Sequence, residues 1–318
     1  MWLWIGFFLL IGLLLALDLG VLNKKSHVIS AREALKWTAL WVSLSLLFSV
    51  FVYYAYDRGW VESHLTGGKA VVTYLTGYLV EQSLSLDNIF VIALIFSYFR
   101  VPDAFQHRVL FWGILGAVIF RGMMIGFGIA LIHRFDWMMY VFGVLLLYSA
   151  YKMLTAGESV HPSKNSVIRL LKRFFPITKK YEGQRFFVRR RNFEKRKSVL
   201  VATPLFVALI MVETTDIMFA FDSIPAIFAI TTDPFIVFTS NIFAILGLRS
   251  MYFVLASMLN RFEHLKYSLV IILFFVAFKM LAHKWVNLPD LLSLIIIFVS
   301  LLAGVIISLW LTGRDKKK

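Results

Sequence analysis

Residues 70–98 read AVVTYLTGYLVEQSLSLDNIFVIALIFSY, and this run decides both the fold and where a functional site is expected. A helix of that length extends about 44 Å, whereas the hydrocarbon core of a bilayer is about 30 Å thick. The run nevertheless carries Glu81 and Asp87 in its interior. An ionised aspartate at mid-membrane costs about 2.5–3.5 kcal/mol on insertion scales, so it requires a counter-charge, a proton or a metal ion. The run therefore predicts a membrane-spanning helix that contains a functional site.

Long apolar runs continue along the whole chain. Of its 318 residues, 60% are hydrophobic, and the mean hydropathy is +0.79. A soluble domain is about 45–50% apolar. We predict an all-α polytopic membrane protein, a single transmembrane domain over residues 1–318 with nine spans. The spans are Trp2–Leu22, Thr38–Tyr56, Ala70–Tyr98, Val109–Ile132, Trp137–Leu154, Val199–Ile230, Phe235–Leu259, Tyr267–His283 and Leu291–Leu311.

The net charge of +15 is concentrated in two segments. Residues 152–198 hold 14 lysines and arginines against three glutamates, which gives +11, and residues 314–318 add +3. Because positively charged loops stay on the cytoplasmic side, we predict a basic cytoplasmic loop at residues 155–198 and a basic cytoplasmic tail at residues 312–318. Such loops lie against anionic lipid headgroups, and this explanation of the charge is favoured over nucleic-acid binding.

The shorter loops alternate in the same way between rich and poor in basic residues. The positive-inside rule then places the N-terminus outside, on the periplasmic side, and the C-terminus in the cytoplasm. The expected location is the inner membrane of a bacterium. A reporter that is active only outside the cytoplasm should be silent when it is fused after Lys318. It should be active when it is inserted in the loop of residues 57–66. The opposite pattern would overturn both the orientation and the count of nine spans.

Two segments of the chain resemble each other. Residues 81–88 (EQSLSLDN) and residues 216–223 (DIMFAFDS) each place an acid six residues before an aspartate, which a small polar residue follows. Downstream, an Ile-Leu-Gly triplet precedes an arginine in both halves, Arg121 and Arg249. The repeated unit is about three spans long, so the copies cross the membrane in opposite directions. We predict an inverted-topology repeat of spans 3–5 and 6–8, as in many secondary transporters.

Six carboxylates lie within the predicted spans. Oxygen ligands are also offered by Asn88, Ser223, Thr214 and Thr215, with Gln82 and Asn241 as further candidates. The chain has no cysteine, and its seven histidines fall at span ends or in loops. Oxygen-rich sites suit Mn²⁺, Ca²⁺ and Mg²⁺, whereas Zn²⁺ and copper favour imidazole or thiolate. The predicted metal-site residues are Asp18, Glu81, Asp87, Asn88, Glu213, Asp216, Asp222 and Ser223, with Arg121 and Arg249 balancing charge and protons neutralising further carboxylates.

This hypothesis treats the metal ion as cargo, so we expect no resident cofactor and no enzymatic activity. Asp87 and Asp222 form its central pair because they occupy equivalent positions in the repeat. Residues six apart lie about 240° around a regular helix, so Glu81 and Asp87 would face different sides. For all the acids to meet one ion, we expect spans three and six to unwind or kink. Pro225 would assist by freeing the carbonyl of Phe221.

The same residues carry a family resemblance. Residues 77–91 (GYLVEQSLSLDNIFV), 219–235 (FAFDSIPAIFAITTDPF) and 239–252 (TSNIFAILGLRSMY) resemble segments of TerC-family integral membrane proteins. The resemblance is strongest to the Alx-type bacterial branch, which has nine spans. It covers roughly residues 10 to 310, and the basic residues 185–197 are its least family-like part. It implies manganese export, and the family is also associated with metal supply to exported proteins and with tellurium resistance.

Three functions remain open from the sequence. The leading one is Mn²⁺ efflux coupled to the proton gradient, with Ca²⁺ or Mg²⁺ as alternative cargo. The second is a stress-response scaffold without transport of its own, which docks through the basic loop. The third is an intramembrane aspartyl protease, but the Gly-x-Gly-Asp context of such enzymes is missing at Asp87 and Asp222. The lack of thiols and of a haem-ligand motif disfavours a direct redox role.

Overall fold

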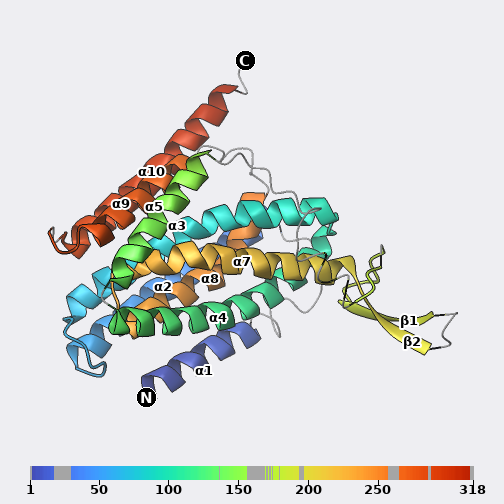
Figure 1. The fold of residues 1–318 in the computed structure, drawn as a ribbon, viewed down its shortest axis with the longest axis horizontal. Coiled ribbons are helices and arrows are strands. Elements are labelled where there is room, and N and C mark those ends of the chain that lie inside the picture. Colours follow the sequence, from blue (N-terminus) through green and yellow to red (C-terminus); the bar gives the residue numbers. More distant parts are fainter. Residues whose placement is uncertain are drawn as a thin grey trace.

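The computed structural model describes residues 2–17, 30–135, 137–155, 169, 171, 173, 175–178, 180–192, 197–256, 265–285 and 288–315. Within these residues the chain forms nine helices and one β-hairpin (Figure 1). The elements are α1 (Trp2–Leu17), α2 (Ala31–Asp57), α3 (Gly67–Phe99), α4 (Asp103–Arg134), α5 (Met138–Thr155), β1 (Phe187–Asn192), β2 (Lys197–Ala202), α7 (Pro204–Phe228), α8 (Pro234–Ala256), α9 (Leu265–Leu281) and α10 (Asp290–Asp315). Seven of these helices are long and apolar enough to cross a membrane. The prediction of an all-α polytopic membrane protein is confirmed.

Helices α3 and α8 form the centre of the bundle. In the most apolar stretch of 18 residues, 94% of α8 is buried inside the protein, against 67% of α3 and 17% of α5. A helix that is apolar on all sides is typical of such a core position. Helix α8 packs on α2, α3 and α4, while α3 also packs on α7 and α10. The outer helices expose large apolar side chains, as a lipid-facing surface requires.

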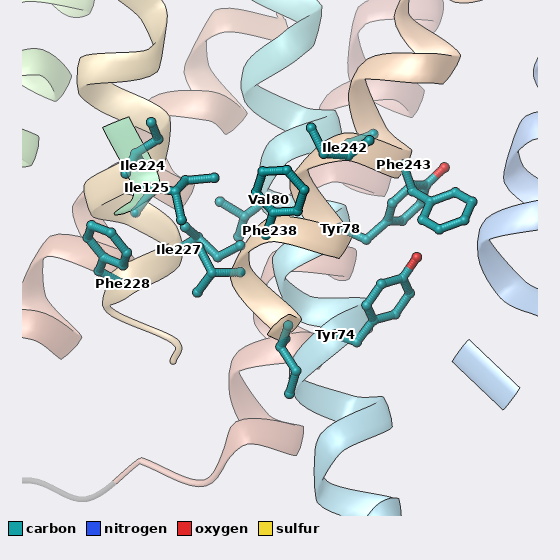
Figure 2. Close-up of a cluster of buried hydrophobic side chains, with 14 of the residues drawn as sticks. Tyr74, Tyr78, Val80, Ile125, Ile224, Ile227, Phe228, Phe238, Ile242 and Phe243 are labelled. Atoms are coloured by element: carbon teal, nitrogen blue, oxygen red, sulfur yellow. The ribbon is translucent and has the colours of Figure 1, made fainter. Parts of the chain in front are cut away.

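The interface between these central helices is closely packed and apolar. The side chains labelled in Figure 2 come from four helices: Tyr74, Tyr78 and Val80 of α3, Ile125 of α4, Ile224, Ile227 and Phe228 of α7, and Phe238, Ile242 and Phe243 of α8. Gly77 of α3 lies within this cluster. A Cβ atom at Gly77 would lie 2.9 Å from Ile227 Cδ1 and 3.0 Å from Ser240 Oγ. The lack of a side chain therefore lets α3 approach α7 and α8, as small residues do between membrane helices.

The two halves of the chain pack in reciprocal pairs. Helix α3 packs on α8, α4 packs on α7, and α5 packs on α9. These are the contacts that an exchange of α3–α4–α5 with α7–α8–α9 would give. The inverted orientation of the repeat itself stays a prediction.

The basic loop contains a hairpin, in which β1 and β2 pair antiparallel along their whole length. Thr203 holds its base, because the Thr203 hydroxyl donates to the Arg185 carbonyl at 2.8 Å. The Tyr181 hydroxyl donates to the Phe99 carbonyl at the end of α3, at 2.7 Å. Burial raises the pKa of Tyr181, so the hydroxyl stays protonated and can donate this hydrogen bond. Figure 1 shows the hairpin projecting beyond the end of α7.

Two predictions about the spans are wrong. The sixth span is predicted to begin at Val199, but residues 199–202 belong to β2, and α7 begins at Pro204. Proline suits the first turn of a helix because no N–H donor is needed there. The expected unwinding of spans three and six does not occur, since α3 and α7 are continuous helices. Pro225 lies in the last turn of α7, where it removes one hydrogen bond without interrupting the helix.

Candidate cation site

Arg121 is the centre of a buried polar cluster that α3, α4, α7 and α8 build together. It is the nineteenth of the 32 residues of α4 and is 1% exposed. Glu81 is the fifteenth of 33 residues in α3, and Asp216 is the thirteenth of 25 in α7. Both carboxylates are also buried. The three charged groups therefore meet near mid-helix, the depth at which the ion sites of secondary transporters lie.

The Arg121 guanidinium binds both carboxylates at once. Its Nε and Nη2 atoms donate to the two oxygens of Asp216 at 3.2 and 2.8 Å. Its Nη1 atom donates to Glu81 Oε1 and to Ser223 Oγ, the latter at 3.2 Å. Such forked, charge-assisted hydrogen bonds fix geometry as well as charge. The guanidinium is therefore held in one orientation between α3 and α7.

Two asparagines hold the carboxylates from the other side. Asn88 Nδ2 of α3 donates to Asp216 Oδ1 at 3.0 Å, and Asn241 Nδ2 of α8 donates to Glu81 Oε2 at 2.8 Å. Because the amide nitrogens face the carboxylates, the amide oxygens face away. Asn88 Oδ1 and Asn241 Oδ1 are both buried without a hydrogen-bond donor. A buried acceptor without a donor costs about 1–3 kcal/mol, so the cluster is short of positive and donor groups.

The formal charges of the cluster also indicate a shortage of positive groups. Two carboxylates against one guanidinium leave a formal charge of −1 when Glu81 and Asp216 are ionised. Glu213 lies one helical turn before Asp216 on α7, and its Oε2 atom is buried without a donor. The Glu213 carboxylate lies against Gly116 of α4, at a place that a Cβ atom would fill. The site thus has negative charge and oxygen ligands in excess of what Arg121 satisfies.

Regular helix geometry explains which predicted residues meet. Residues seven apart lie nearly two full turns apart and share a helix face. Glu81 and Asn88 form one such pair, and Asp216 and Ser223 form the other. All four therefore face the Arg121 guanidinium or its partner carboxylates.

Asp222, a further predicted residue, lies away from this cluster. Asp222 accepts a hydrogen bond from Ser149 Oγ of α5 at 2.5 Å, on a different face of α7 from Asp216. Asp87 is half-buried on α3, and Arg249 is buried on α8. Asp18 lies outside the described residues. Within the described part of the chain, no group of three or more His, Cys, Asp or Glu side chains is arranged to hold a metal ion.

One residue at these sites, Ser149, was not predicted. Asn241 was a candidate oxygen ligand from the sequence, and the structure places its amide nitrogen on Glu81. Ser149 carries no signal in the sequence, since serine in a membrane helix commonly satisfies its hydroxyl locally.

The chain matches the TerC family of integral membrane proteins over residues 66–316. It belongs to this family. It is 47% identical over 308 residues to an uncharacterized membrane protein of Myxococcus xanthus, covering 96% of this chain and 92% of the relative. It is 43% identical over 319 residues to a protein of Escherichia coli (strain K12) named "Putative membrane-bound redox modulator Alx", covering 99% and 97% of the two chains. No solved structure matches the chain.

All three segments that resemble TerC proteins contribute to the cluster. Residues 77–91 supply Glu81 and Asn88, residues 219–235 supply Ser223, and residues 239–252 supply Asn241. These three segments therefore supply four residues of the cluster, whereas Arg121 and Asp216 lie outside them.

Proposed function

We propose that this TerC-family protein is a transporter that exports a hard divalent cation, and that its cargo is Mn²⁺. The observation that supports this most is the cluster around Arg121, in which two buried carboxylates face one guanidinium and two amide oxygens lack donors. With both carboxylates ionised, the cluster has a formal charge of −1 that a bound cation would offset. An excess of buried carboxylate and carbonyl oxygen suits a hard cation such as Mn²⁺, Mg²⁺ or Ca²⁺.

The choice of Mn²⁺ over Mg²⁺ and Ca²⁺ rests on the family resemblance and not on the geometry. The direction of transport, export from the cytoplasm, also rests on the family resemblance. The proposed topology places the basic loop and the basic tail on the cytoplasmic side of the inner membrane. Proton coupling belongs to the same proposal, since carboxylates such as Glu213 that are not neutralised by Arg121 could carry protons.

The test is uptake of divalent ions into proteoliposomes that contain the full chain. The protein should move Mn²⁺ in preference to Mg²⁺ and Ca²⁺, and a pH gradient should change the rate. Vesicles without protein and vesicles with the Asp216→Asn variant are the controls. Equal ion movement in all three preparations would overturn the proposal.

A scaffold role is the second candidate, and the hairpin is the observation that favours it. Arg185, Arg189 and Arg190 are exposed on or beside β1, where they could bind anionic lipid headgroups or another partner. The name of the Escherichia coli relative suggests a redox role, but this chain has no cysteine with which to perform thiol chemistry. Asp216→Asn should leave a scaffold working, whereas neutralising the three hairpin arginines should not.

A further inference from the structure

We propose that Arg121 is a built-in competitor for the cargo: its guanidinium occupies the cation position between Glu81 and Asp216, and this competition selects divalent over monovalent ions. The inference rests on the proposed transport function, which it deepens. A metal ion would be admitted only by displacing the guanidinium from the carboxylates.

The contacts of Arg121 are those expected of a substitute cation. The guanidinium contacts both oxygens of Asp216 and one oxygen of Glu81, so it lies between the two carboxylates that a metal ion would need. Within the described residues, no group of three acids is arranged around this position to hold a metal ion without a change in the side chains. While the Arg121 guanidinium stays there, it fills the space between the two carboxylates. Another cation therefore cannot bind in that position.

Charge then decides which ions can compete. A tethered group has an effective concentration in the millimolar range or above, and it does not need to diffuse to the site. A monovalent ion carries the same charge as the guanidinium but lacks its N–H donors. Replacing Arg121 with such an ion therefore brings no gain in binding free energy. A divalent ion attracts each carboxylate with twice the Coulomb energy at equal distance and balances the pair completely. Only the divalent ion therefore has a reason to displace Arg121.

The incoming ion would also find ligands that Arg121 cannot use. A guanidinium is a donor only, so it leaves the buried amide oxygens of Asn88 and Asn241 without a partner. A hard cation accepts such carbonyl oxygens as ligands beside carboxylates. Because the amide nitrogens face the carboxylates in the arginine-bound state, both amides would turn over to present these oxygens to the ion.

The displaced guanidinium needs a new partner, because an unpaired buried charge is costly. Glu213 provides one. It lies on α7 one turn before Asp216, and its carboxylate lies against Gly116, five residues before Arg121 on α4. Glu213 and Asp216 are three residues apart, so they share the face of α7 that Arg121 contacts. The Glu213 Oε2 atom is buried and lacks a donor.

The test compares Mn²⁺ binding by the purified full chain and its variants, measured by calorimetry and by metal-induced thermal stabilisation. Arg121→Lys keeps the positive charge but loses the fork, so it should fold and be displaced more easily. We expect Mn²⁺ affinity to rise about tenfold, which corresponds to the loss of one charge-assisted hydrogen bond from the competitor. Potassium ions should compete with Mn²⁺ in this variant but not in the parent protein. Lys279→Gln, which removes a cation outside the cluster, should change neither property.

Two further variants test the role of Glu213. Glu213→Gln should weaken Mn²⁺ binding in the parent protein but not when it is combined with Arg121→Gln, because no guanidinium then needs a partner. A direct metal ligand would weaken binding in both backgrounds. Arg121→Gln is prepared with Mn²⁺ present, since the metal replaces the missing charge.

The outcomes separate the two proposals. If the parent protein binds Mn²⁺ and Arg121→Lys binds it equally or more weakly, the competitor role is wrong and transport can stand. If neither the parent protein nor any variant binds Mn²⁺, Mg²⁺ or Ca²⁺, the proposed function fails as well.

Discussion

Replacing Asp216 with asparagine is expected to abolish manganese export while the protein reaches the membrane at normal abundance. Asparagine keeps the volume of the side chain, and its amide oxygen can still accept from Asn88 and Arg121. The substitution removes one negative charge, so Glu81 and Arg121 become a matched pair. The site then has no net attraction for a divalent ion. Mutating a residue that only orients a metal ligand typically lowers metal affinity about 10–100-fold. We expect a larger loss for Asp216→Asn.

The measurement is total cell manganese after a Mn²⁺ challenge, in a strain that lacks its own exporters. Asp222→Asn is the matched comparison, because it makes the same change six residues further along α7, where the carboxylate accepts from Ser149 instead. We expect a smaller loss for Asp222→Asn than for Asp216→Asn. If Asp216→Asn exports as well as the parent protein and Asp222→Asn does not, the repeated aspartates form the site and the Arg121 cluster is structural.

The helices could be predicted from the sequence because length and hydropathy suffice for a membrane helix. Residues 70–98 predicted a span, and α3 covers them as Gly67–Phe99. The hairpin could not be predicted in the same way. Residues 199–202 are as apolar as the helix that follows them, so no change of composition marks the end of β2. Only the Thr203-Pro204 pair signals where α7 begins.

Several members of the cluster could be predicted from the sequence, but their arrangement could not. The repeat drew attention to Asp87 and Asp222, because identical residues stand out in a comparison of two segments. In continuous helices, however, the acid that opens each segment shares a face with the small polar residue that closes it. Glu81 and Asp216 are therefore the carboxylates that meet. The expectation of broken helices led away from this pairing, because residues seven apart share a face only in a continuous helix.

Arg121→Met is expected to have the largest effect on stability. It leaves Glu81 and Asp216 buried without their cation, and removing one partner of a buried ion pair costs about 3–5 kcal/mol. The apparent melting temperature of the detergent-solubilised protein should fall steeply, and the variant should be depleted from the membrane. Lys279→Met is the control. It breaks the single ion pair that Lys279 forms with the partly exposed Asp290 at 3.2 Å, outside the Arg121 cluster, and should lower the melting temperature less.

The informative result is the triple variant that adds Glu81→Gln and Asp216→Asn to Arg121→Met. All three side chains are then neutral and close to their original volume, and the new amides can still accept hydrogen bonds from Asn241 and Asn88. Neutralising all three groups together removes the cost of leaving carboxylates buried without a cation, so most of the lost stability should return. Manganese export should not return, because no charge remains to hold the ion. A triple variant as unstable as Arg121→Met would mean that the fold itself requires these charges, and the case for a cation site would lose its main support.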